Sequence, residues 1–393
     1  MDRQTIAVLK PTLSHDFHWN ELDYANIIFY FQCAYAVGYV LFGRLIDKLG
    51  ARLGYSIAVV IWTSAHIACA FVGSLAGFGY MLFALGLGQS GNFPAALKVV
   101  AEWFPQRERA FANGLFNAGS NIGAILTPMI VPIITLTFGW HMAFVATGSL
   151  SLIWLIWWIA VYRRPRESKR LKPAELAFIE SDQQAPTKQV PWFSLFPVKE
   201  TWAFAIAKFL TDPIWWFYLF WLPAFFVKKY GLDIKTFGSP IIVIYLLSDI
   251  GGIAGGWMSS AMIKAGASVN VARKSTMLLC ALCVLPVMFA MYVSNEWAAV
   301  GLVGLATAAH QAFSANLLAL PSDLMPKAAV GSVVGIGGTA GSLGGMLMTW
   351  GTGQILQYTG SYTPIFIIAG TMYLVALVVM QRLSPRLTPA QLT

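Results

Sequence analysis

Charge is scarce in this chain. Only 11% of its 393 residues are Asp, Glu, Lys or Arg, whereas 57% are hydrophobic. Soluble globular proteins carry roughly 25% charged residues, so this composition excludes a soluble enzyme, a nucleic-acid-binding protein and a disordered chain. The formal net charge of +9 therefore needs an explanation other than nucleic-acid binding.

Cysteines and catalytic motifs are also scarce. Four cysteines are too few for a disulfide-rich fold. Cys280 and Cys283 have the C-x-x-C spacing, but they lie in an apolar stretch without a second pair, which disfavours a metal or redox site. The sequence has no Walker-type loop and no constellation of a nucleophile with its base. We therefore expect neither an enzyme nor an ATP-driven pump, and neither a cofactor nor a metal.

Long apolar stretches dominate the sequence instead. A helix needs about 20 mainly apolar residues to cross a bilayer, and eleven stretches come close to or exceed that length. The alternating pattern of lipid-facing strands is absent, so we predict that the spans are helices. The stretches are 23–43, 53–74, 77–100, 110–137, 141–162, 201–227, 238–263, 275–293, 297–320, 328–355 and 363–381.

The basic residues lie on alternate sides of these spans. One set of loops carries 18 of the 26 Lys and Arg residues, and the opposite loops carry only Lys228, Lys229 and Lys235. The positive-inside rule places the first set in the cytoplasm. We therefore expect a multi-pass protein of the plasma (inner) membrane whose linker and C-terminus are cytoplasmic. The cluster at 163–172 also fits a polybasic patch on the membrane surface.

The longest polar stretch divides the chain into two similar halves. We predict an N-terminal helical bundle over 1–162, a cytoplasmic linker over 163–200, a six-helix bundle over 201–383 and a cytoplasmic tail over 384–393. The first half holds five spans and a short leading segment, which would be the end of a first helix truncated in this sequence. Internal repeats of this kind are typical of transporters. The predicted fold is thus an all-α membrane protein of two pseudo-symmetric six-helix bundles; the alternative is a genuine eleven-span protein.

The loop between the first two apolar stretches has the pattern G-x-L-x-D-x-x-G-x-R. Gly43 and Gly50 allow helix ends to approach closely, and Asp47 can pair with a basic residue or lie at a helix N-terminus. Together with Arg52, these residues form a predicted gating motif. The pattern resembles that of the major facilitator superfamily.

Further motifs lie at 2–5, 11–13, 86–95, 102–105, 108–110, 116–123, 212–216, 309–311 and 314–316. They resemble the anion:cation symporter family of that superfamily, and within it the hexuronate and aldonate transporters. The resemblance implies import of a sugar-acid anion together with a cation, usually a proton, by alternating access. The expected partners are a small carboxylate sugar, a coupling proton or sodium ion and the lipid bilayer, but no nucleic acid, and the chain is expected to be a monomer.

Two positions depart from the family pattern. Members usually carry an Arg that helps to hold the substrate carboxylate and a Glu that takes part in proton coupling, where this chain has Leu82 and Gln89. Gln89 can hydrogen-bond a substrate, but it cannot titrate. The choice between proton and sodium therefore stays open. Two alternative functions also remain, namely a carrier of another small organic anion and a non-transporting sensor or defective carrier.

Ionisable residues near or within the spans mark candidate substrate and ion paths. The resemblance places the substrate-binding Arg at Arg3, whose guanidinium can hold a carboxylate with two hydrogen bonds. It also places a cation-coupling acid at Asp2. The alternatives are an Arg that reaches interfacial water and a simple surface acid.

The second half carries its own ionisable residues. Lys208 and Asp212 are four residues apart, so they share a helix face and can pair. Pro213 interrupts helix hydrogen bonding beside them, which frees carbonyl groups. Asp212 is a second candidate for cation coupling, and a purely structural pair is the alternative. For Asp249, an interhelical pair and a substrate contact are both open.

Neutral polar and aromatic side chains suit the hydroxyl groups and C–H faces of a sugar. The resemblance places Tyr35 and Ser120 at cavity positions. The alternative for each polar candidate is a hydrogen bond between helices, worth about 0.6 kcal/mol in a membrane. The other candidates for sugar binding are Gln89, Asn121, Trp215, His310, Gln311, Ser314 and Asn316.

Overall fold

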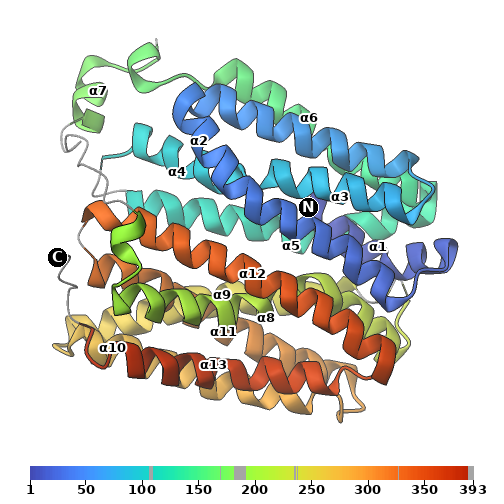
Figure 1. Ribbon diagram of the computed structural model, residues 1–393. Helices are drawn as coiled ribbons and strands as arrows, with labels where there is room; N and C mark the ends of the chain where they lie inside the picture. Colours follow the sequence, from blue (N-terminus) through green and yellow to red (C-terminus); the bar gives the residue numbers. More distant parts are fainter. Residues whose placement is uncertain are drawn as a thin grey trace. The chain divides into compact units, whose positions relative to one another are not determined.

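A computed structural model describes residues 1–105, 109–168, 170–180, 192–233, 236, 238–325 and 327–387. In this part of the chain the regular structure is helical, with thirteen α-helices and no strand (Figure 1). The all-α prediction is therefore confirmed. The helices are α1 (Asp2–Phe17), α2 (Glu21–Ala68), α3 (Leu75–Gln89), α4 (Asn92–Trp103), α5 (Arg109–Phe138), α6 (Trp140–Val161), α7 (Pro173–Glu180), α8 (Lys199–Tyr230), α9 (Gly238–Lys264), α10 (Val269–Val284), α11 (Glu296–Leu324), α12 (Lys327–Thr359) and α13 (Thr363–Leu383).

The chain forms two compact units. Unit 1 comprises Met1–Trp19 and Asn26–Thr187, and unit 2 comprises Asn20–Ala25 and Lys188–Thr393. Within unit 1, α1 packs against α5 and α6, and α4 and α6 pack against α5. Within unit 2, α8 packs against α12 and α13, α9 and α10 pack against α11, and α10 packs against α13 (Figure 1).

Eight helical segments in the described residues are long and apolar enough to cross a membrane. They coincide with eight of the eleven predicted stretches, and the other three stretches are also helical. The stretch 77–100 is divided into α3 and α4 by a turn at Ser90 and Gly91. Pro94 has no N–H with which to continue the helix from the preceding turn, and it is tolerated there because it lies in the first turn of α4.

The long helix α2 contains one of these spans and all but the last three residues of a second. They are Glu21–Ile46 and Lys48–Phe71, and the helix is kinked between its two parts at Gly50. Gly50 has a φ of 82°, a conformation that costs little only for a residue without a Cβ. The second glycine of the predicted gating motif is thus required by the backbone conformation.

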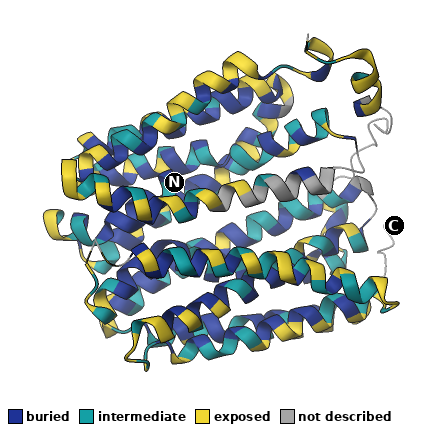
Figure 2. Cartoon of the chain, turned by 180° about the vertical axis from the view of Figure 1, so that it is seen from behind, coloured by how far each residue is buried: buried dark blue, intermediate teal, exposed yellow. Residues whose placement is uncertain are grey.

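The helices expose large apolar side chains. On α6, Ile153 is 64% exposed and Ile156 69% exposed, and on α9 Ile253 is 76% exposed and Trp257 71% exposed. Figure 2 shows buried and exposed residues on opposite faces of the helices. Apolar surface on this scale in both units needs a lipid environment. The outer faces of the helices therefore suit a bilayer.

Candidate functional site

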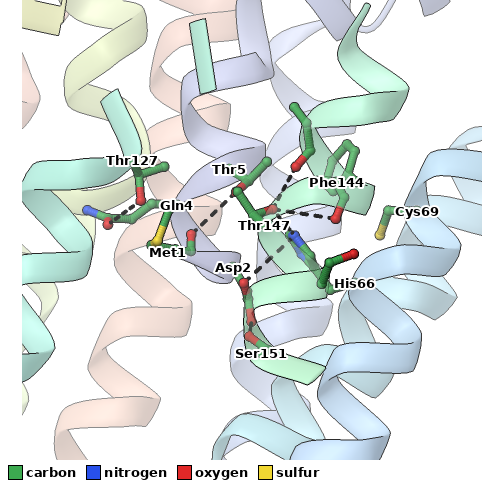
Figure 3. A network of polar contacts seen from close by, with 12 residues as sticks. Met1, Asp2, Gln4, Thr5, His66, Cys69, Thr127, Phe144, Thr147 and Ser151 are labelled. Carbon is green, nitrogen blue, oxygen red and sulfur yellow. Dashed lines mark hydrogen bonds and ion pairs between the residues drawn. The ribbon is translucent and has the colours of Figure 1, made fainter. Parts of the chain in front are cut away.

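The first polar cluster lies in unit 1, around the carboxylate of Asp2. Asp2 is in the first turn of α1 and only 7% exposed. The hydroxyl of Ser151 on α6 donates a hydrogen bond to its Oδ2 at 2.9 Å, and Nε2 of His66 on α2 lies 3.9 Å from its Oδ1 (Figure 3). Three helices thus meet at one buried carboxylate.

His66 is held in this cluster by a second hydroxyl. The hydroxyl of Thr147 lies 2.7 Å from the carbonyl oxygen of Ala143, to which it donates. Its oxygen therefore accepts from His66 Nε2, which is also 2.7 Å away. This arrangement places the ring proton on Nε2. The sequence interpretation missed His66, although a titratable residue inside an apolar stretch is the same signal that singled out His310.

The other predicted residues of unit 1 are spread over several helices. Arg3 lies half-buried on α1 beside Asp2, and Gln89 lies half-buried at the end of α3. Tyr35 is buried on α2, with its hydroxyl 3.5 Å from that of Tyr39. The side chains of Ser120 and Asn121 on α5 lie outside the described residues.

The second cluster lies in unit 2 and contains an ion pair. Nζ of Lys208 is 2.6 Å from Oδ2 of Asp212, and their side chains are 12% and 20% exposed. The predicted pairing of these two residues is therefore present. On α12, Gly341 packs directly on this carboxylate, and a Cβ at that position would collide with Oδ2 of Asp212. Close packing of α12 on α8 thus helps to bury the pair.

His310 and Trp215 also come together in unit 2. Their rings stack with centroids 5.3 Å apart and an interplanar angle of 7°. Nδ1 of His310 is 2.6 Å from the hydroxyl of Tyr373 on α13, and Trp215 lies edge-on to Tyr245 at 6.0 Å. Gln311 is half-buried next to His310 on α11. An aromatic surface with hydrogen-bonding groups at its edge is suited to a sugar ring.

Asn316 lies in a different network. Its Nδ2 donates to the carbonyl oxygens of Gly255 at 3.1 Å and Ala312 at 2.9 Å, and its Oδ1 accepts from Arg273 at 3.3 Å. Arg273 also pairs with Asp323, with Nε 3.1 Å from Oδ2. Apart from the bond to Ala312, which lies within α11, these contacts join α9, α10 and α11. They fit the alternative that Asn316 makes hydrogen bonds between helices.

The predicted gating motif connects α2 with the end of α6. Arg52 donates from Nη2 to the carbonyl oxygen of Ile159 at 2.6 Å, and Trp158 donates from Nε1 to the carbonyl oxygen of Arg52 at 3.3 Å. Gly43 lies on α2 in open surroundings, whereas the side chain of Asp47 lies outside the described residues. The motif therefore has a structural role at this end of unit 1.

Tyr162 and Glu102 add one further polar contact just beyond α6. The Tyr162 hydroxyl donates to Oε2 of Glu102 at 2.6 Å. Burial and this hydrogen bond to a carboxylate hold the pKa of Tyr162 well above its ordinary value. The hydroxyl consequently remains a donor and ties the end of α6 to α4.

No group of three or more His, Cys, Asp or Glu side chains in the described part of the chain is arranged to hold a metal ion. Cys280 and Cys283 are both free thiols.

Comparison with known proteins shows the family of the chain. Residues 1–349 match the Major Facilitator Superfamily. The chain is 30% identical over 387 residues to a hexuronate transporter of Escherichia coli (strain K12), which covers 97% of this chain and 89% of that protein. It is 32% identical over 263 residues to a galacturonate transporter of Dickeya chrysanthemi, which covers 66% of this chain and 76% of that protein.

Solved structures show the same fold. The crystal structure of a D-xylose-proton symporter matches with a TM-score of 0.78 and 16% identity, covering 98% of this chain and 94% of that one. The relatives and the family are transporters and not enzymes.

Proposed function

Because this chain belongs to the major facilitator superfamily, we propose that it is a secondary transporter that imports a sugar-acid anion. The substrate is a hexuronate or an aldonate, and the driving force is a cation gradient, which we infer to be that of the proton. The observation that carries the proposal is the 30% identity over nearly the whole chain to a hexuronate transporter. The buried ionisable groups of both units support it, because such groups in membrane proteins mark substrate and ion paths.

The site residues take separate roles in this proposal. Arg3 holds the substrate carboxylate, since a guanidinium binds that group with two parallel hydrogen bonds. Asp2 carries the coupling proton, and Asp212 is the second candidate for that role. The sugar hydroxyls and ring are bound by the remaining candidates, which are Tyr35, Gln89, Ser120, Asn121, Trp215, His310 and Gln311. Asn316 is left out because its amide contacts protein groups on both sides.

We place the protein in the plasma (inner) membrane as a monomer. The distribution of Lys and Arg among the loops supports a cytoplasmic position for its linker and C-terminus. The motif of Gly43, Asp47, Gly50 and Arg52 acts in gating at the cytoplasmic side.

Uptake into proteoliposomes tests the proposal. The purified chain is reconstituted, a pH gradient that is acidic outside is imposed, and the internal concentrations of radiolabelled glucuronate, galacturonate and galactonate are measured. We expect at least one of them to be concentrated inside and the effect to vanish when a protonophore is added. Accumulation under a sodium gradient alone would reject the proton as coupling ion, and no uptake of any sugar acid would reject the substrate class.

A further inference from the structure

His66 is part of the polar cluster around Asp2. The proposed function gives His66 no role. His66 is completely buried, on the second span of α2. Its Nε2 lies 2.7 Å from the Thr147 hydroxyl and 3.9 Å from Oδ1 of Asp2. The imidazole therefore lies within reach of a buried carboxylate that comes from a different helix.

The Asp2 carboxylate has contacts from two other helices and a charge beside it on its own. Its Oδ2 accepts a hydrogen bond from Ser151, its Oδ1 lies 3.9 Å from His66, and the amino group of Met1 interacts with it electrostatically. A buried carboxylate with few donors is costly unless it is paired or protonated. A single proton taken up by Asp2 and His66 together changes their combined charge from −1 to zero, whether the proton is on the carboxyl group or on the ring.

The second ring nitrogen of His66 is an independent observation. Nδ1 is buried and has no hydrogen-bond partner among the residues that the structure describes. A histidine that only tied helices together would leave this nitrogen unpaired at a cost of about 1–3 kcal/mol. Each such exception among buried polar groups needs an explanation. A role in which Nδ1 accepts a proton, or a hydrogen bond from water, during transport is one explanation.

The surroundings of His66 contain few other charged groups. The charges that act on it electrostatically are the Asp2 carboxylate and the amino group of Met1. Arg3 follows Asp2 on α1, and the thiol of Cys69 lies near the end of α2. From α6 the facing groups are neutral, namely the hydroxyls of Thr147 and Ser151 and the ring of Phe144, whose centroid is 5.2 Å away.

We propose that Asp2 and His66 form one proton-binding site, in which Ser151 and Thr147 hold the two titratable groups in place. The proton enters from water, binds to the carboxylate or the imidazole and returns to water on the other side. This inference rests on the proposed proton symport. It adds that His66 is required for proton coupling and not for substrate binding.

Two transport assays distinguish coupling from binding. Accumulation driven by a pH gradient needs net proton movement, whereas counterflow exchange of labelled for unlabelled substrate does not. The variant His66→Gln keeps an N–H donor near the position of Nε2 but cannot titrate. The matched control is His141→Gln, which makes the same change at an exposed histidine of α6.

We expect His66→Gln to lose accumulation and to retain counterflow, and His141→Gln to retain both. Accumulation at the wild-type level in His66→Gln would overturn the proposal. Loss of counterflow in a variant that still melts like the wild type would also overturn it, because His66 would then serve substrate binding.

A second variant covers the case in which His66→Gln does not fold. Ser151→Ala removes a donor from the Asp2 carboxylate, so we expect the pH midpoint of accumulation to move upward by about one unit. An unchanged midpoint would contradict the proposed site.

A substrate-free measurement separates this inference from the proposed function. If the wild-type protein takes up no sugar acid, the proposed function fails, and the proton site is judged by nuclear magnetic resonance of ¹⁵N-histidine in the detergent-solubilised protein. We expect a ring signal that is absent in His66→Gln to change with pH, and to change over a different pH range in Asp2→Asn. A His66 signal with the same pH response in Asp2→Asn, or with none in the wild type, would overturn the proposal.

Discussion

The two units bury charge in different ways. In unit 2 the carboxylate of Asp212 has an ammonium partner at 2.6 Å on the same helix, so the pair is neutral as it stands. In unit 1 the carboxylate of Asp2 faces a hydroxyl and an imidazole from other helices. A carboxylate with an ammonium partner on its own helix is already paired, whereas a carboxylate beside an imidazole from another helix can share a proton with that ring. We therefore expect unit 1 to carry the coupling proton and unit 2 to contribute to substrate binding.

The largest effect is expected from a substitution of Asp2, which tests whether unit 1 carries the coupling proton. Asp2→Asn keeps an oxygen that accepts from Ser151, but it removes the titratable group. We expect accumulation under a pH gradient to be lost and counterflow to continue. Asp16→Asn, on the exposed part of the same helix, is the control. Continued accumulation in Asp2→Asn would transfer the coupling role to Asp212.

The next effect concerns the ion pair of unit 2. Lys208→Met leaves the partly buried Asp212 carboxylate without its partner. The loss of one partner from a fully buried pair costs about 3–5 kcal/mol of stability, and this figure is an upper bound for the partly exposed pair. We expect a large decrease in the melting temperature of the detergent-solubilised protein and a partial recovery in the double variant Lys208→Met, Asp212→Asn. Lys199→Met, at the exposed start of α8, serves as the control. A single variant as stable as the wild type would show that the pair is not needed for folding.

A third prediction concerns substrate binding in unit 1. Arg3→Gln removes charge-assisted hydrogen bonds to the substrate carboxylate, so we expect affinity for a sugar acid to fall by about a hundredfold. Quenching of tryptophan fluorescence by the substrate measures this affinity. Arg44→Gln, at an exposed position of α2, should bind normally. Wild-type affinity in Arg3→Gln would move the carboxylate site elsewhere.

The smallest expected effect lies at Tyr373. Tyr373→Phe removes the hydrogen bond to Nδ1 of His310 and keeps the ring that packs on Phe313 at 5.3 Å. Hydrogen bonds between membrane helices are worth about 0.6 kcal/mol, so we expect a small decrease in thermal stability. A loss as large as that predicted for Lys208→Met would mean that unit 2 depends on this hydrogen bond as much as on its ion pair.

Much of the fold was predictable because hydropathy and loop charge are local properties of the sequence. The pairing of Lys208 with Asp212 was predictable for the same reason, since a spacing of four residues fixes a shared helix face. The partners of Asp2 were not predictable, because His66 and Ser151 come from distant segments that meet only through packing. The contacts of Asn316 were not predictable either, because its residue type suits a sugar while its amide is bonded to groups on α9 and α10. A single sequence does not distinguish these two uses of a polar side chain.

The kink at Gly50 has a practical consequence for experiments on topology. Two candidate spans of α2 follow one another with a single residue between them, and a residue with positive φ separates the two parts of the helix. An epitope or reporter inserted at this junction would disrupt both spans, because there is no intervening loop to absorb it. Sidedness assays should therefore use single-residue labels here, such as a cysteine at the exposed Lys48.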